Sequence, residues 1–239
     1  MVTIWKREWK SFFHTPVGYV FIGVFLALSG LMFYLNNLLP LSGELLIFLS
    51  QLTLMVMLLS PMLTMRLLCE ERQKKTDQLL LTSPVSLTQI VLGKYFAAAA
   101  VMMTAILLTN LYTLIIGMYG AFYAGEWFVG YLGFCLQSLC FLALDLLVTC
   151  TAKNQVSAVI SAFAANFALW MIDAVAENVQ IGFLSRIFSF VSLYDRYEPF
   201  VLGQLSYASV LFFLSFIGVC LVATVHVLDA RRFSQGGAA

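Results

Sequence analysis

The chain has 239 residues, of which 62% are hydrophobic and only 10% are charged, and its mean hydropathy is +0.93. Soluble domains carry about 25% charged residues, so this composition excludes a soluble globular protein and indicates that lipid solvates most of the chain. The net charge of +1 comes from lysines and arginines spread over several segments, which argues against a nucleic-acid-binding surface.

The first segment, residues 1–16, has the pattern of an amphipathic helix lying in the lipid headgroup layer. Apolar and aromatic side chains recur at helical spacing, with basic and polar side chains on the other face. The apolar set is Ile4, Trp5, Trp9, Phe12 and Phe13, and the polar set is Lys6, Arg7, Lys10 and Ser11. Both a plain membrane anchor and an elbow helix that braces a moving bundle fit this pattern. The apolar stretch that follows is too long for a cleavable signal peptide.

Six apolar stretches follow, each near the 20 or so residues that a transmembrane helix needs. They are residues 17–39, 45–68, 95–119, 127–151, 156–176 and 207–228. The pattern predicts an all-α, polytopic membrane protein whose residues 1–239 form a single transmembrane domain. The three largest pieces outside the predicted spans are residues 1–16, 69–94 and 177–206.

The distribution of lysine and arginine predicts the orientation, because basic loops stay on the cytoplasmic side. With both termini inside, eleven of the 13 basic residues are cytoplasmic, and only Arg186 and Arg196 are external. The sequence therefore predicts six spans with cytoplasmic amino and carboxyl termini.

Residues 69–94 form a cytoplasmic loop with internal organisation. Glu70 and Glu71 place negative charge where a helix begins, and Pro84 disfavours helix in the residue before it. Ser86 and Gln89 then form a capping-box pattern that starts the next helix. We expect a short helix through Leu81 that either inserts its leucines into a groove on a cytoplasmic partner or rests them on lipid.

Asp145 is the costliest residue inside a predicted span. It precedes Lys153 by eight residues, which places it roughly 12 Å from the cytoplasmic end of its helix. Water or Arg66 is its expected partner. It lines either a pathway or an interface between subunits, or it is a structural carboxyl. Asn110, Gln137 and Asn166 are expected to form hydrogen bonds between helices.

Sulfur-containing residues in the spans are expected to pack rather than bind metal. Five cysteines lie in or beside apolar runs and fit small buried side chains better than disulfides or a metal site. The cysteines are Cys69, Cys135, Cys140, Cys150 and Cys220. Methionines of the second span could suggest a copper ligand set, but methionine is a common filler of apolar helices. They are Met55, Met57, Met62 and Met65.

No catalytic motif is evident, so we expect a protein that is not itself an enzyme. The chain has no Gly-x-x-x-x-Gly-Lys-Ser/Thr phosphate loop. The two histidines, His14 and His226, lie far apart in sequence, and neither His-Glu-x-x-His nor Gly-x-Ser-x-Gly occurs. An ion-coupled carrier is also disfavoured, because Asp145 has no counterpart in the other half of the chain.

The cytoplasmic loop resembles that of the permease subunits of type-two ABC exporters. The match comprises a run of residues before the third span and a Gly-Lys pair that lies between this run and the span. The run is Arg72, Thr76, Asp77, Leu79, Leu80, Thr82, Ser83, Pro84 and Val85, and the pair is Gly93 and Lys94. The family's usual glycine before the threonine is Lys75 here. The resemblance implies a coupling helix that docks into an ATPase subunit, with Glu71, Arg72, Thr76, Asp77, Leu79, Leu80, Thr82 and Pro84 as coupling residues.

A second match lies between the last two predicted spans. Residues 192–203 are similar to a segment of the permeases related to gliding-motility and nitrous-oxide-reductase-maturation transporters. The matching positions include Tyr197, Pro199, Phe200 and Gly203, although relatives often have His-Phe where Tyr197 stands. In this family the external region caps the path between two permeases and can contact an extracytoplasmic partner.

The resemblance implies a multi-pass permease of a bacterial or archaeal cytoplasmic membrane that couples ATP hydrolysis to export. The chain itself would bind no cofactor, with ATP and magnesium on a separate ABC ATPase subunit. The other implied partners are a second permease copy or paralogue and an extracytoplasmic accessory protein. The alternative is a non-transporting membrane scaffold or a mechanotransmitting anchor of an envelope complex. Asp145, Asn110 and Asn166 are the candidates for the pathway or the permease interface.

Overall fold

The computed structural model describes residues 2–73, 86–119, 123–176 and 192–236, and this part of the chain is almost entirely helical. The helices are α1 (Val2–His14), α2 (Pro16–Phe33), the π-helical η1 (Tyr34–Leu38), α3 (Leu45–Gln73), α5 (Leu87–Tyr119), α6 (Ala124–Thr149), α7 (Gln155–Ala176), α9 (Leu193–Val201) and α10 (Tyr207–Gly236). No strand occurs in the described ranges, which confirms the predicted all-α class.

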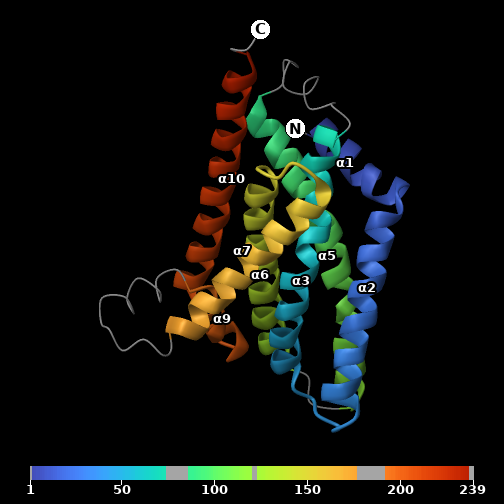
Figure 1. Cartoon of the computed structure of the whole chain (residues 1–239). Helices are drawn as coiled ribbons and strands as arrows, with labels where there is room; N and C mark the ends of the chain where they lie inside the picture. The colour runs from blue at the N-terminus through green and yellow to red at the C-terminus, as the bar shows by residue number, and fades with distance from the viewer. Residues whose placement is uncertain (1, 74–85, 120–122, 177–191, 237–239) are drawn as a thin grey trace.

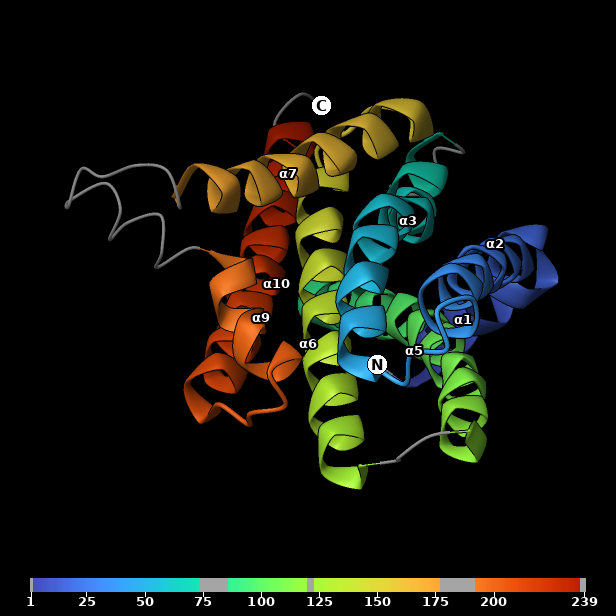
Figure 2. The same cartoon turned by 90° about the horizontal axis from the view of Figure 1, so that it is seen from below.

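Five helical segments within the described residues are long and apolar enough to cross a membrane. They are α2 continued by η1, α3, α5, α6 and α10. The fifth predicted span, residues 156–176, corresponds to α7, whose described apolar part, Gln155–Met171, is shorter than the other five helical segments. This helix runs obliquely past its neighbours (Figures 1 and 2). The multi-pass class is thus confirmed, and the sixth crossing stays a prediction.

The bundle is built around α3 and α6, which pack along each other at its centre (Figure 2). Helices α2 and α5 cover one side of this pair, and α9 and α10 pack on α6 from the other side. Phenylalanines from most of these helices fill the core, because a large flat ring contacts several helices at once. Those with no exposed surface are Phe21, Phe25, Phe48, Phe134, Phe200 and Phe213.

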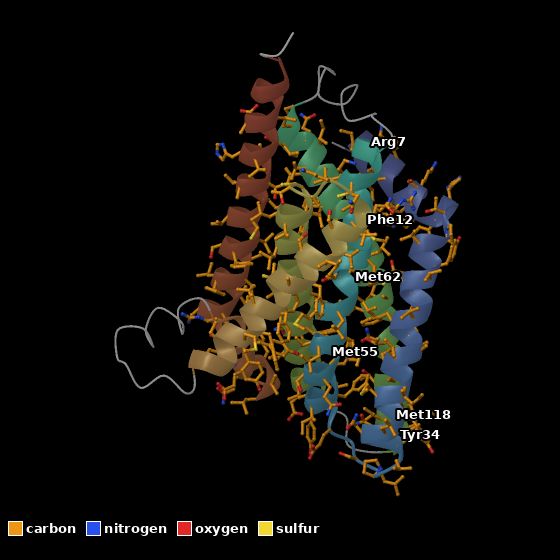
Figure 3. The ribbon with its side chains drawn as sticks, viewed as in Figure 1. Arg7, Phe12, Tyr34, Met55, Met62 and Met118 are labelled. Carbon is orange, nitrogen blue, oxygen red and sulfur yellow. The ribbon has the colours of Figure 1, made fainter. Side chains whose placement is uncertain are left out.

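The two ends of the bundle differ in what they carry (Figure 1). Helix α1, the carboxyl end of α3, the amino end of α5 and the carboxyl end of α10 lie together at one end, which we call the amino-terminal end. The connection between η1 and α3 lies at the opposite end, which we call the distal end. Figure 3 shows Arg7 and Phe12 at the amino-terminal end, and Tyr34 and Met118 at the distal end.

Most of the sulfur-containing side chains pack in the apolar core. Met57 is buried, and Met62 and Met65 pack against buried apolar clusters. Met55 and Met62 lie at different heights along α3 (Figure 3). All five cysteines are in the described ranges and none forms a disulfide there; four are buried and Cys135 is half-buried.

Candidate functional site

Arg66 of α3 holds the bend between α1 and α2. Its guanidinium donates hydrogen bonds to the Thr15 hydroxyl, to the Ser11 carbonyl oxygen at 3.4 Å and to Ser11 Oγ at 3.1 Å. It also lies over the Phe12 ring, 5.8 Å from the centroid. Thr15 directly precedes Pro16, whose fixed φ suits the first turn of α2. The Arg66 guanidinium therefore links α3 to the bend between α1 and α2.

Lys94 of α5 makes a second link at the same end of the bundle. Its side chain is fully buried, its ammonium donates to the Leu67 carbonyl oxygen of α3 at 2.5 Å, and Glu8 Oε1 of α1 lies 3.7 Å away. A buried charge is costly unless it is paired and hydrogen-bonded. Groups of α3 and α1 meet both conditions, so Lys94 of α5 joins the three helices.

Helix α1 approaches α5 closely next to this pair. The Trp5 indole N–H donates to the Phe96 carbonyl oxygen at 3.2 Å. A Cβ at Gly93 would lie 2.9 Å from Ile4 Cγ2, closer than real Cβ contacts. Glycine at position 93 therefore permits the contact, and α1 packs on protein along the face that carries Ile4, Trp5 and Glu8.

The start of α5 agrees with the predicted capping pattern. Ser86 Oγ accepts a hydrogen bond from the Gln89 backbone N–H at 3.4 Å, and α5 begins at Leu87.

On the other side of the loop, α3 continues to Gln73, five residues beyond the predicted end of the span at residue 68. Of the expected coupling residues, Glu71 and Arg72 lie in the last turn of α3. The other six, Thr76, Asp77, Leu79, Leu80, Thr82 and Pro84, lie outside the described residues.

Asp145 is the centre of a buried polar cluster that joins α3, α6 and α7. Its carboxylate accepts a hydrogen bond from Ser60 Oγ at 2.5 Å and another from Asn166 Nδ2 at 2.9 Å. All three side chains have no exposed surface. Of the two expected partners, water and Arg66, the Arg66 guanidinium is instead directed to α1, and the protein partners of Asp145 are Ser60 and Asn166.

Proline explains why Asn166 belongs to this cluster. Pro61 lies inside α3 and has no N–H, so the carbonyl of Met57 four residues earlier loses its helical hydrogen bond. Asn166 Nδ2 donates to that carbonyl oxygen at 3.2 Å. A neighbouring helix thus satisfies the backbone group that proline leaves unpaired, as membrane interiors require.

The structure separates Asn110 from the other two pathway candidates. Asn110 lies on α5, and its Oδ1 accepts a hydrogen bond from the Trp127 indole of α6 at 3.0 Å. Gln137 of α6 likewise accepts a hydrogen bond from Thr53 of α3 at 3.3 Å. The predicted hydrogen bonds between helices are therefore confirmed for Asn110, Gln137 and Asn166. Only Asp145 and Asn166 come together.

The four named residues of the external segment lie in and just after α9. Ser192 caps this helix by accepting from the Asp195 N–H at 3.0 Å, and Gly203 follows its end with a φ of +70°, which favours glycine. Pro199 lies inside α9, whereas Tyr197 and Phe200 are buried. A Cβ at Gly133 of α6 would be 2.5 Å from Phe200 Cβ, so α9 packs directly on the α6 backbone.

Burial also determines the protonation state of Tyr197. Removal from solvent raises the pKa of the phenol well above its ordinary value, and the hydrogen bond with Thr53 lowers it only in part. The phenol is thus neutral throughout the physiological pH range and available as a hydrogen-bond donor or acceptor.

Sequence patterns missed three residues of these clusters. Glu8 is the only acidic residue of α1, and the predicted amphipathic pattern assigned it no role. Ser60 and Pro61 lie in an apolar stretch of the second predicted span. A proline inside a predicted span is the available signal, because it implies an unpaired carbonyl four residues earlier and a polar partner on a neighbouring helix.

Apolar helices of membrane length, joined by buried polar clusters, define a multi-pass membrane protein. A protein-family model described as ABC-2 family transporter protein matches residues 6–170, more than half of the 239-residue chain. The chain belongs to this family, and it is a membrane transport component without an ATPase motif of its own. No curated protein matches the chain by sequence.

Proposed function

We propose that the chain is the membrane-spanning permease subunit of an ATP-driven exporter of a bacterial or archaeal cytoplasmic membrane. Six helices, α7 included, cross the membrane, and both termini lie in the cytoplasm. A separate ABC ATPase subunit carries ATP and magnesium and docks on residues 69–94. A second permease copy or paralogue completes the path, and residues 177–206 face an extracytoplasmic accessory protein.

One observation carries this proposal. Helices α3 and α5 flank residues 74–85, and each is tied to α1 by a cation, Arg66 from α3 and Lys94 from α5. Because Lys94 also binds the α3 backbone, a displacement of the loop moves α1, α3 and α5 as one body. This is the arrangement that a lever between a motor subunit and a helix bundle needs, and it favours the bracing role of α1 over a plain anchor.

The polar cluster at Asp145 supports a connection from this lever into the bundle. Ser60 lies on the same helix as Arg66, and its hydrogen bond to Asp145 links α3 to α6. Asn166 extends the link to α7. Hydrogen-bond networks with discrete arrangements are the kind of element through which two sites are coupled.

The test uses the permease co-expressed with the ATPase encoded beside it and purified in lipid nanodiscs. Asp77→Lys and Leu80→Pro are expected to weaken copurification of the ATPase and its stimulation by the permease by about tenfold or more, as for loss of a hot-spot contact. The control is Lys153→Glu, a charge reversal in the α6–α7 turn at the same end of the bundle. If all three variants bind and stimulate the ATPase like the native chain, the docking assignment is wrong.

A further inference from the structure

Helix α1 packs on the bundle with one face only. Glu8 and Phe12 lie on this face, against Lys94 of α5 and Arg66 of α3. The opposite face, which we call the open face of α1, is exposed and carries both aromatic and basic side chains. Figure 1 shows α1 lying across the amino-terminal end of the bundle, next to the start of α2.

The chain itself sets the depth of the open face. Helix α1 ends at His14 and the first apolar segment of membrane length begins at Pro16, so only Thr15 separates them. A helix that lies across the bundle and is joined so closely to a span is at the level of the lipid headgroups. The headgroup layer is therefore the medium that the open face meets.

A row of aromatic rings runs along one edge of the open face and continues onto α2. The ring centroids of Trp9 and Phe13 are 5.3 Å apart, and those of Phe13 and Tyr19 of α2 are 5.4 Å apart. Trp9 is 38% exposed and Tyr19 is 61% exposed. Tryptophan and tyrosine are enriched where the bilayer meets water, because their rings have an apolar body and a polar tip. The row therefore marks the edge of α1 that borders the hydrocarbon.

Two exposed lysines lie beside this row. Lys6 and Lys10 are four residues apart on α1, and Lys6 precedes Trp9 by three residues, so the three side chains are neighbours on the helix surface. Neither lysine forms an ion pair with a residue that the structure describes, whereas Arg7 pairs with Glu8 at 2.7 Å. The open face thus presents two positive charges at headgroup depth.

We propose that the open face of α1 binds the headgroup of an anionic phospholipid. The face comprises Lys6, Trp9, Lys10 and Phe13, with Tyr19 of α2. The two ammonium groups contact the phosphate, and the acyl chains lie along the aromatic row. A zwitterionic phospholipid is disfavoured, because its own cationic group offsets the charge of its phosphate. An acidic protein segment is disfavoured as well, because it would supply no apolar surface to the aromatic row.

Quenching of Trp9 fluorescence by brominated lipids tests the site in the full-length chain. The other three tryptophans are replaced as Trp5→Phe, Trp127→Phe and Trp170→Phe. The chain is reconstituted in vesicles of phosphatidylcholine and phosphatidylglycerol, with bromine on the acyl chains of one lipid at a time. We expect phosphatidylglycerol to quench at a mole fraction about fivefold lower than phosphatidylcholine does, the factor that one basic residue contributes at an anionic surface.

Lys6→Gln and Lys10→Gln remove the charges and keep polar side chains of similar size. In the double variant, the two brominated lipids are expected to quench Trp9 equally. Lys153→Gln is the matched control, because Lys153 is an exposed lysine in the turn between α6 and α7 at the same end of the bundle. It should leave the preference for phosphatidylglycerol unchanged.

Three results would overturn the proposal. One is equal quenching by the two lipids when both lysines are present, and another is a preference for phosphatidylglycerol that survives in the double variant. The third is the absence of quenching by either lipid, which would mean that a protein segment covers the open face.

Native mass spectrometry of the chain with all four tryptophans provides a second readout that does not depend on the tryptophan substitutions. Phosphatidylglycerol adducts should outnumber phosphatidylcholine adducts at equal lipid concentrations. Lys6→Gln with Lys10→Gln should reduce the phosphatidylglycerol adducts about fivefold or more, and Lys153→Gln should not. An equal reduction in the double variant and in the control would contradict the proposed site.

The inference goes beyond the proposed function, because neither readout needs the ATPase or ATP. A preference for phosphatidylglycerol without ATPase docking would remove the proposed function and leave the lipid site. Intact docking without this preference would do the reverse.

Discussion

At the scale of single residues, the proline that interrupts the hydrogen bonding of α3 explains why α7 carries a buried asparagine. Pro61 removes a hydrogen bond from α3, and the freed Met57 carbonyl is satisfied by Asn166 of α7, which also donates to Asp145. Asp145 is thereby buried with a donor on each oxygen. Pro61 therefore helps to position Asp145, because the asparagine that satisfies the freed Met57 carbonyl also donates to the Asp145 carboxylate.

This reasoning predicts coupling between positions 61 and 166. Asn166→Leu should cost about 1–2 kcal/mol of unfolding free energy, because it leaves two acceptors without a donor. In a Pro61→Ala background the cost should be about 1 kcal/mol smaller, since the introduced alanine has an N–H that can bond to the Met57 carbonyl oxygen. Unfolding in mixed micelles measures both values in a double-mutant cycle.

Asn110→Leu provides the control for this cycle. It makes the same change of side chain on α5, where the partner is Trp127, so its cost should not depend on residue 61. An equal cost of Asn166→Leu in the two backgrounds would show that the Met57 carbonyl does not explain the role of Asn166.

At the scale of elements, the docking of α9 depends on the absence of a side chain. Gly133 presents bare backbone to Phe200, and the Phe200 ring lies beside Tyr197 and Phe213. Because α9 also carries the buried Tyr197, this contact positions that side chain as well.

Gly133→Ala should therefore displace α9. The added methyl group overlaps the Phe200 side chain, and overpacking of this kind costs about 1–3 kcal/mol. Hydrogen exchange of residues 193–201 should become faster relative to the native chain. Gly218→Ala is the control, because a Cβ there meets nothing within 4 Å. If the two variants have the same exchange rates at α9, the close contact does not hold this helix.

Several elements could be predicted from sequence, and the physical reasons are specific. Hydrophobic length located the membrane helices, and the Ser86 cap located the start of α5, because both signals are local. The amphipathic pattern of residues 1–16 predicted the helix α1 but not its contacts, since Glu8 meets a lysine, Lys94, from a distant part of the chain.

The partners in the buried clusters could not be predicted for the same reason. A polar residue in a span indicates that a partner exists, but its identity depends on which helix faces meet. The sequence predicts water or Arg66 as the partner of Asp145. The Arg66 guanidinium instead donates to Thr15 at the bend, and the uncharged Ser60 and Asn166 donate to the carboxylate.

At the scale of the whole molecule, the account depends on which end of the bundle faces the cytoplasm. Helix α1, the ends of α3 and α5 that flank residues 74–85, and the carboxyl end of α10 lie together. The connection at Leu41, whose side chain is 90% exposed, lies at the distal end. A motor subunit can act on the loop only if the amino-terminal end is cytoplasmic.

Cysteine accessibility tests this point most directly. The five native cysteines are replaced, and a single cysteine is introduced as Lys75→Cys or as Leu41→Cys in cells whose inner membrane is exposed but sealed. With a membrane-impermeant maleimide, Leu41→Cys should be labelled in intact cells and Lys75→Cys only after the membrane is permeabilised. Labelling of Lys75→Cys from outside sealed cells would contradict the account, because no cytoplasmic ATPase could then reach the loop.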